Sequence, residues 1–133
     1  MKISLEIAEG LYRIGAFDPG CVTLERGGSD GGVQERVQQR SSFMLSPDQL
    51  VPDWGPTTIE QVGVAELEPV LKLEPTLVLL GTGNRSVLPD MALMQFFLSR
   101  GVGFETMQTA AACRTFNLLA YEGRRVVAAL ILE

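Results

Sequence analysis

The chain has 133 residues and carries 16 Asp and Glu against 11 Lys and Arg, no His and only two Cys. A net charge of −5 argues against the basic surface that binds nucleic acid or anionic membranes. The lack of His removes the usual general base near neutral pH and the commonest zinc ligand, so we expect no metal and no cofactor. The length, residues 1–133, suits one domain whose core needs no disulfide.

The two cysteines, Cys21 and Cys113, stand at no spacing typical of a disulfide framework or a metal site. We therefore expect reduced, unpaired thiols and a cytoplasmic protein. The N-terminus alternates polar and apolar residues and resembles neither an export nor an import signal. The longest apolar run, residues 126–132, is far shorter than the roughly 20 residues that span a bilayer as a helix. The sequence thus predicts no membrane span.

Residues 1–60 have the pattern of short antiparallel strands separated by turns. The expected strands are residues 4–7, 11–14, 22–24 and 42–45. Residues 27–32, GGSDGG, lack the Lys of a phosphate-binding loop and favour a mobile hairpin tip. Residues 34–39 fit a strand or a turn of helix equally well. Trp54 lies between two prolines that forbid helix, and we expect it to fill a core edge where the two halves of the chain meet.

From residue 64 to 133 the pattern changes to alternating helices and strands, a βαβαβ core. The expected helices are residues 65–71, 89–99 and 110–120. The second has Pro89 in its first turn and Asp90 near its positive end, and the last has Thr109 as its N-cap. Links of this length imply right-handed crossovers. We therefore expect strands 76–80, 102–107 and 126–132 to be parallel neighbours in one sheet, with the apolar last strand inside it. The fold class is α/β.

The first candidate binding loop follows strand 76–80. Ligands of open parallel sheets bind beyond the carboxyl ends of the strands. Backbone amides, a hydroxyl, a carboxamide and a guanidinium gather there, from Gly81, Thr82, Gly83, Asn84 and Arg85. This set suits an anion. The alternative is a tight turn whose glycines adopt positive φ and let strand and helix approach closely.

The second candidate loop opens the helix after strand 102–107. Thr109 and the three alanines at 110–112 leave free amides at the positive end of that helix, which favour an anion. Arg114 and Asn117 share a helical face and could close on one acceptor. The alternative is that Arg114 pairs with Glu105, because a carboxylate in an interior strand needs a partner.

Cys113 lies near the start of the same helix, beside Arg114, where a thiolate could be stabilised. A thiol without a base or a second Cys is more often a small buried apolar group. We therefore expect Cys113 to be buried and unreactive.

The string at residues 101–117, GVGFETMQTAAACRTFN, with LGTG at 80–83 and the segment around Trp54, resembles a widespread family of small bacterial and archaeal proteins of unknown function. Its best-known eukaryotic members are the mitochondrial complex I assembly factor 3 proteins. The resemblance covers residues 40–132 and implies a three-layer β/α/β fold with a mixed central sheet, no established enzymatic activity and, in the eukaryotic branch, a role in assembling respiratory complex I. Gln108 and Phe116 stand where the family usually has an acidic residue and a Tyr.

Together these observations predict a non-enzymatic binding or assembly protein linked to respiratory complex assembly, with no catalytic residue assigned. Its partner is another protein or a small anionic ligand, and its pocket lies at two helix N-termini. The expected binding residues are Gly81, Thr82, Gly83, Asn84, Arg85, Thr109, Arg114 and Asn117. The alternative is an enzyme that acts on a small anionic metabolite, using Arg85 and Arg114 for binding and Cys113 as nucleophile.

Overall fold

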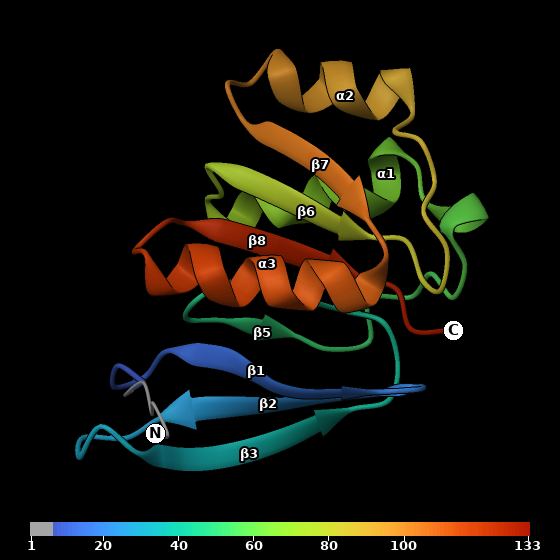
Figure 1. Cartoon of the computed structure of the whole chain (residues 1–133). Helices are drawn as coiled ribbons and strands as arrows, with labels where there is room; N and C mark the ends of the chain where they lie inside the picture. The colour runs from blue at the N-terminus through green and yellow to red at the C-terminus, as the bar shows by residue number, and fades with distance from the viewer. Residues whose placement is uncertain (1–6) are drawn as a thin grey trace.

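The computed structural model describes residues 7–133, which form two β-sheets with helices packed around them (Figure 1). The smaller sheet is antiparallel, in the order β1-β2-β3. Its strands are β1 (Tyr12–Asp18), β2 (Cys21–Gly27) and β3 (Val33–Gln39). The expected hairpin at 27–32 is confirmed as the β2–β3 turn, and residues 34–39 are strand. Of the expected strand 4–7, residues 4–6 lie outside the described part of the chain.

The larger sheet has five strands in the order β5-β4-β8-β6-β7. They are β4 (Phe43–Leu45), β5 (Leu50–Val51), β6 (Leu77–Gly81), β7 (Gly103–Met107) and β8 (Val126–Leu130). β6 pairs in parallel with β7 on one side and β8 on the other, whereas β4 pairs antiparallel with β8 and β5. This confirms that the three C-terminal strands are parallel neighbours and that the last of them lies inside the sheet.

The helices follow the expected order with shifted boundaries. They are η1 (Ile59–Gln61), α1 (Val64–Leu67), η2 (Glu68–Leu73), α2 (Met91–Leu98) and α3 (Thr109–Tyr121). The expected helix 65–71 is one α-helical turn that continues as a 3₁₀ helix, with Pro69 near its start. α2 begins after Asp90, whose carboxylate accepts a hydrogen bond from the Ala92 amide at 2.7 Å. Within residues 7–133, no helix combines the length and the apolarity needed to cross a bilayer.

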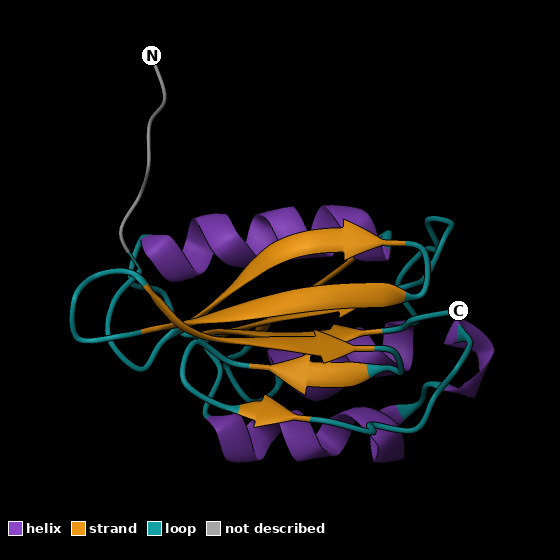
Figure 2. Ribbon diagram, turned by 90° about the horizontal axis from the view of Figure 1, so that it is seen from below, coloured by secondary structure: helices purple, strands orange, loops and turns teal. Residues whose placement is uncertain are grey.

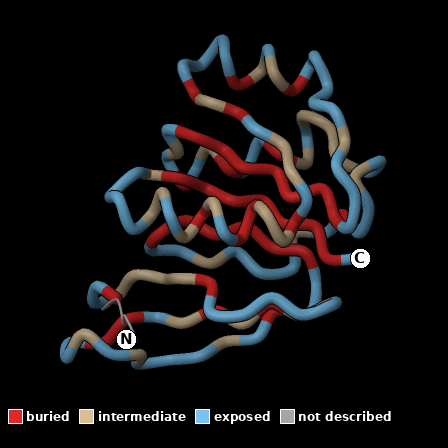
Figure 3. Tube along the Cα trace, viewed as in Figure 1, coloured by how far each residue is buried: buried red, intermediate tan, exposed pale blue. Residues whose placement is uncertain are grey.

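The layers of the fold are set by the apolar faces of its helices and sheets, which pack against one another. α3 packs against β6 and β8 and also against β1, so it lies between the two sheets and gives the β/α/β arrangement. Figure 2 shows helices on both sides of the strands. β6 and β8 are buried along their whole length (Figure 3), as an apolar strand covered on both faces should be.

Alternate residues of the central strands feed two core clusters. Leu79 and Ala128 face the cluster that α3 and β2 complete, where Phe116 is fully buried. Val78 and Val127 face the cluster that α1 and α2 complete. Trp54 packs against the second cluster and donates its indole N–H to the carbonyl of Glu66 at 2.8 Å, which confirms its place where the halves meet.

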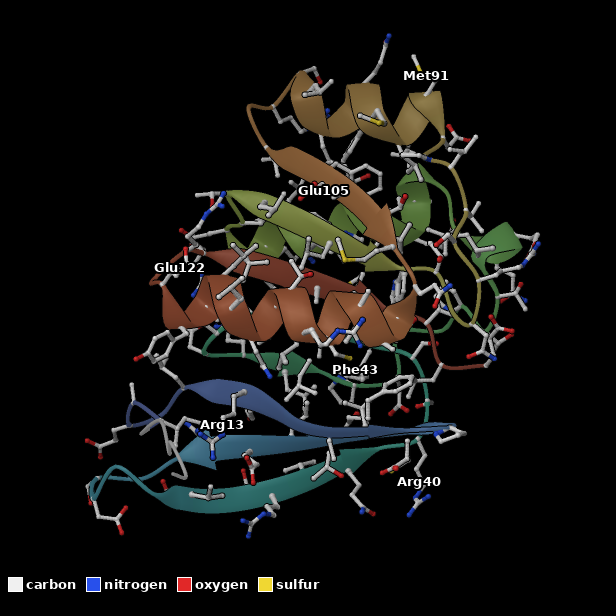
Figure 4. All side chains as sticks on the ribbon, viewed as in Figure 1. Arg13, Arg40, Phe43, Met91, Glu105 and Glu122 are labelled. Carbon is white, nitrogen blue, oxygen red and sulfur yellow. The ribbon has the colours of Figure 1, made fainter. Side chains whose placement is uncertain are left out.

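The expectation that residues 102–107 form an interior strand is wrong. β7 is an edge strand, and Glu105 is exposed (labelled in Figure 4). The reason is topological: the crossover through α3 returns past β6 to place β8 on its far side, so β7 has one neighbour. A carboxylate there needs no buried partner.

Candidate functional site

The carboxyl ends of β6 and β7 lie side by side, and the chain leaves them toward opposite faces of the sheet, into α2 and α3. Such a switch point is where open α/β sheets bind ligands. A cavity of about 300 Å³ lies there, which we call the strand-end pocket. It is lined by Ile59, Glu60, Val62, Leu80, Thr82, Val87, Leu88, Asp90, Leu93 and Thr106.

Two hydroxyl groups tie the loop after β6 to the strand ends. The hydroxyl of Thr82, which is buried, lies 2.6 Å from the carbonyl of Arg85 and 3.2 Å from that of Met107. The hydroxyl of Thr106 donates to the carbonyl of Val87 at 3.0 Å. A hydroxyl has one proton to donate, so both protons are used in holding the loop. Hydrogen bonds within the chain therefore fix the shape of the pocket before any ligand binds.

Arg85 forms an ion pair with Glu60, which is one of the residues that line this pocket. Both side chains are about two-thirds exposed, at 67% and 63%. The pKa of the Glu60 carboxyl is lowered, first by a hydrogen bond from its own backbone N–H and further by the charge of Arg85. An anionic ligand at Arg85 would have to compete with this carboxylate.

Thr109 joins three segments of the chain. Its hydroxyl donates to the carbonyl of Ile131 at 2.8 Å and accepts from the amide of Gly83 at 2.9 Å, while its own amide donates to the carbonyl of Gly83 at 3.0 Å. The expectation that Thr109 is the N-cap is wrong: the N-cap is Gln108, and Thr109 is the first helical residue. A Cβ on Gly81 would lie 2.9 Å from the Thr109 hydroxyl, so the close approach requires glycine.

Gly83 and Asn84, in the loop after β6, are also fixed by the chain itself. Gly83 has φ of +89°, a conformation that favours glycine. The amide of Asn84 donates to the carboxylate of Glu133 at 2.9 Å. The loop thus binds a negatively charged group, the carboxylate of Glu133, which belongs to the same chain.

Asn117 points toward the three-stranded sheet. Its carboxamide donates to the carbonyl of Ile14 and accepts from the amide of Ile14, each at 2.8 Å. Arg114 is exposed, and none of the ion pairs within residues 7–133 joins it to Glu105. The structure therefore brings Gly81, Gly83 and Thr109 into direct contact, and it directs Asn117 to β1.

Cys113 is 3% exposed and free, and Cys21 is also free. Burial raises the pKa of the Cys113 thiol to about 12, and the charge of Arg114 offsets this only in part. The expectation of a buried, unpaired thiol is confirmed. Within the described residues, no group of three or more His, Cys, Asp or Glu side chains could hold a metal ion.

A second cavity, of about 310 Å³, lies between β1, the end of α3 and the turn after β4. Sequence reasoning missed it because three distant segments without a motif contribute to it. Its lining is Ile7, Ala8, Leu11, Tyr12, Arg13, Pro47, Asn117, Ala120 and Tyr121. Both tyrosines of the chain line this cavity, which periodicity within one segment does not reveal.

Residues 24–131 match the family described as a protein of unknown function, DUF498/DUF598. A Francisella tularensis protein named 13 kDa major membrane protein is 30% identical over 73 residues, 55% of this chain and 59% of the relative. Rat NADH dehydrogenase (ubiquinone) 1 alpha subcomplex assembly factor 3 is 34% identical over 85 residues, 62% of this chain and 46% of the relative. The chain spans about half the length of the curated relatives it matches.

Solved structures show the same fold. A crystal structure of a Bordetella parapertussis protein has a TM-score of 0.81 at 30% identity, covering 95% of this chain and 99% of that one. An NMR structure of a Xanthomonas campestris protein has a TM-score of 0.73 at 39% identity, covering 91% and 84%. An NMR structure from Bordetella pertussis, described as an Mth938-like domain, has a TM-score of 0.78 at 26% identity, covering 99% and 92%.

Proposed function

The chain belongs to the DUF498/DUF598 family, and from that premise we propose that it is a non-enzymatic protein that binds partner proteins during the assembly of a respiratory complex. Its relatives from rat, mouse and human are named as assembly factors of NADH dehydrogenase. The relatedness supports a shared kind of function, a binding role that needs no catalytic group.

The observation that carries the proposal is how the polar groups at the strand ends are used. The hydroxyl groups of Thr82, Thr106 and Thr109 all donate to backbone carbonyls of the chain. What remains in the lining of the strand-end pocket is a set of apolar side chains and two carboxylates, that of Glu60, which pairs with Arg85, and that of Asp90, which accepts from the Ala92 amide. A preformed pocket of apolar side chains with a few charged groups suits an inserted side chain of a partner protein.

The enzymatic alternative asks Cys113 to act as a nucleophile. A thiol with a pKa of about 12 is protonated at neutral pH, and the thiolate is the reactive form. This supports the binding role over the enzyme. The two free cysteines also support a reducing compartment, and we propose the cytoplasm.

A small anion remains a proposed ligand of the same loops. It would bind Arg85 in exchange for Glu60, with the exposed Arg114 as a second cation. In that case phosphate or sulfate should raise the melting temperature of the protein, because ligands that bind the folded state stabilise it. Glu60→Gln should strengthen this response by freeing Arg85.

The function is tested by deleting the gene and following the assembled NADH dehydrogenase on native gels. We expect assembly to fall in the deletion strain and to return with the wild-type gene. Val87→Asp places a charge in the strand-end pocket and should fail to restore it. Val51→Asp, at a 38% exposed valine on β5 that does not line this pocket, is the matched control and should restore it.

Normal assembly in the deletion strain would overturn the proposal. Cys113→Ser separates the two functions, since a binding protein keeps its activity when a buried thiol becomes a hydroxyl of similar size. Loss of function in a folded Cys113→Ser protein would favour the enzyme.

A further inference from the structure

Among the described residues that line the strand-end pocket, the side chains offer hydrogen-bond acceptors but no cation. Two are carboxylates, those of Glu60 and Asp90, and two are hydroxyl groups, those of Thr82 and Thr106. Both hydroxyl protons are donated to backbone carbonyls of the chain. The other lining side chains are aliphatic. A ligand that enters the pocket therefore meets acceptors and apolar groups, and it has to supply the donors itself.

The hydroxyl oxygens of this pocket have acceptor capacity that the chain does not use. A hydroxyl oxygen has two lone pairs. The oxygen of Thr109 accepts from the Gly83 amide at 2.9 Å, whereas no hydrogen bond within residues 7–133 is donated to the oxygen of Thr82 or Thr106. Thr82 is only 1% exposed. Because buried polar atoms are normally hydrogen-bonded, the lining has a place for a donor from outside the chain.

The charge at the pocket is negative. Arg85 offsets the charge of Glu60 but is not part of the lining. Asp90 accepts from the Ala92 amide at 2.7 Å, and none of the ion pairs within residues 7–133 includes it. A carboxylate without a cationic partner thus borders an apolar cavity of about 300 Å³. A positively charged group of a partner would be attracted there, and a negatively charged one repelled.

Buried apolar and exposed charged groups share this lining. Leu80 and Leu93 are buried, at 1% and 4% exposure, whereas Glu60 and Asp90 are exposed. A long basic side chain that lies in the cavity can place its methylene groups against the leucines and keep its charge beside the carboxylates. A purely apolar side chain would use only the first part of this surface.

Glu60 does not have to give up Arg85 to bind a second cation. Glu25 shows that one carboxylate of this chain can bind two guanidinium groups, since its Oε1 accepts from Arg13 at 2.8 Å and its Oε2 from Arg36 at 3.1 Å. An incoming guanidinium can therefore share Glu60 with Arg85.

We infer that the strand-end pocket binds an arginine side chain of a partner protein. The guanidinium donates to the carboxylates of Asp90 and Glu60, and the hydroxyl oxygens accept from the N–H groups that face inward. A guanidinium has five N–H donors, no acceptor and a permanent positive charge, so it is the complement of this lining. Arginine is also enriched among the residues that dominate binding at protein interfaces. The inference rests on the proposed function, because it takes the pocket as the place where a partner inserts a side chain.

A blocked arginine tests the pocket directly. N-acetyl-L-arginine N-methylamide carries the side chain alone, and N-acetyl-L-citrulline N-methylamide has nearly the same shape with a neutral end. In NMR titrations of the whole chain, the arginine probe should shift the amide signals of Val62, Val87 and Leu93, with a dissociation constant on the order of 1 mM. The citrulline probe should bind at least about tenfold more weakly.

Three results would overturn the inference. They are equal binding of the two probes, no binding of the arginine probe up to about 50 mM, and shifts confined to residues outside the pocket lining.

Charge variants test the carboxylates. Asp90→Asn removes the charge and keeps the helix cap, because Asn is as good an N-cap as Asp. It should weaken binding of the arginine probe at least about threefold, as expected for an exposed carboxylate. Glu60→Gln should weaken it as well, because the charge of Arg85 is then no longer offset.

Glu122→Gln is the matched control, since it changes the net charge equally. Glu122 follows α3 at the end far from the strand-end pocket (Figure 4), and the variant should bind the probe as the wild type does. Melting curves check that all three variants fold. Wild-type binding by both Asp90→Asn and Glu60→Gln, or an equal loss in Glu122→Gln, would contradict the assignment.

The inference and the proposed function can fail separately. If gene deletion leaves NADH dehydrogenase assembly normal while the arginine probe still binds, the proposed function fails and the preference of the pocket for arginine stands. If deletion impairs assembly and the pocket does not distinguish arginine from citrulline, only the inference fails. Where both hold, Asp90→Asn should restore assembly in the deletion strain less well than Glu122→Gln.

Discussion

The two sheets of this protein are stabilised by different means. In the five-stranded sheet, β6 and β8 are buried on both faces, so burial of their own apolar side chains stabilises the centre of the sheet. In the three-stranded sheet most residues of β1 and β3 are exposed or half-buried, and the sheet is fixed from one side, through Val22, Leu24 and the Ile14–Asn117 pair. The comparison shows that the smaller sheet depends on α3 for its place.

The largest effect is expected from Phe116→Ala. Phe116 is fully buried in the cluster that includes both sheets, and truncating a buried Phe costs about 3–5 kcal/mol. Denaturant unfolding should show one transition shifted for probes in either sheet, as the expected single domain requires. Leu118→Ala, exposed on the same helix, should cost about 0.5 kcal/mol or less. Two separate transitions would mean that the sheets unfold independently.

Asn117→Ala should have the next largest effect, because it removes both hydrogen bonds to the Ile14 backbone. Leaving partly buried backbone groups unpaired costs about 1–3 kcal/mol. Hydrogen exchange should quicken at the amide of Ile14 and little at β6. Equal protection of Ile14 in the wild type and Asn117→Ala would show that α3 does not hold β1.

Acid should weaken both sheets through different carboxylates. Burial raises the pKa of Glu25 on β2, but hydrogen bonds and charges from Arg13 and Arg36 outweigh it and the pKa is lowered. The pKa of Asp48 beside the larger sheet is lowered, first by its hydrogen bond from Arg125. The stabilisation is therefore present above the ordinary values of 4.5 and 3.8 and is lost as the pH falls through the lowered ones.

Each of these groups should contribute no more than about 1 kcal/mol, as ion pairs near the surface do. Glu25→Gln and Asp48→Asn should each flatten the dependence of the unfolding free energy on pH below about 4.5. Curves for both variants that match the wild type would show that the carboxylates contribute nothing.

The smallest effect is expected from Arg114→Ala. Arg114 is exposed, and Glu105 lies on an exposed edge strand, so the substitution leaves no buried charge unpaired. The unfolding free energy should change by about 0.5 kcal/mol or less. Melting with and without phosphate then tests the anion proposal: a wild-type increase that Arg114→Ala lacks would support it, and no increase in either protein would contradict it.

Local pattern determined much of this molecule. The apolar run at 76–80 is enough to predict a buried parallel strand, because a strand covered on both faces needs apolar residues at every position. Pro89 and the acidic Asp90 predict that a helix starts there, and the glycines at 81 and 83 predict a tight turn, because helix-end preferences and positive φ depend on neighbouring residues. The strand-end location of the candidate site follows from the same pattern.

Only the tertiary structure decided how the polar side chains are used. Arg85 pairs with Glu60, 25 residues away, and Asn117 with Ile14, 103 residues away. Thr109 bonds to Ile131 instead of capping its own helix. The edge position of β7, which leaves Glu105 exposed, depends on which side of β6 the last strand occupies. Periodicity and turn chemistry act over a few residues, whereas a hydrogen-bond partner is chosen by whichever group the packed layers bring within reach.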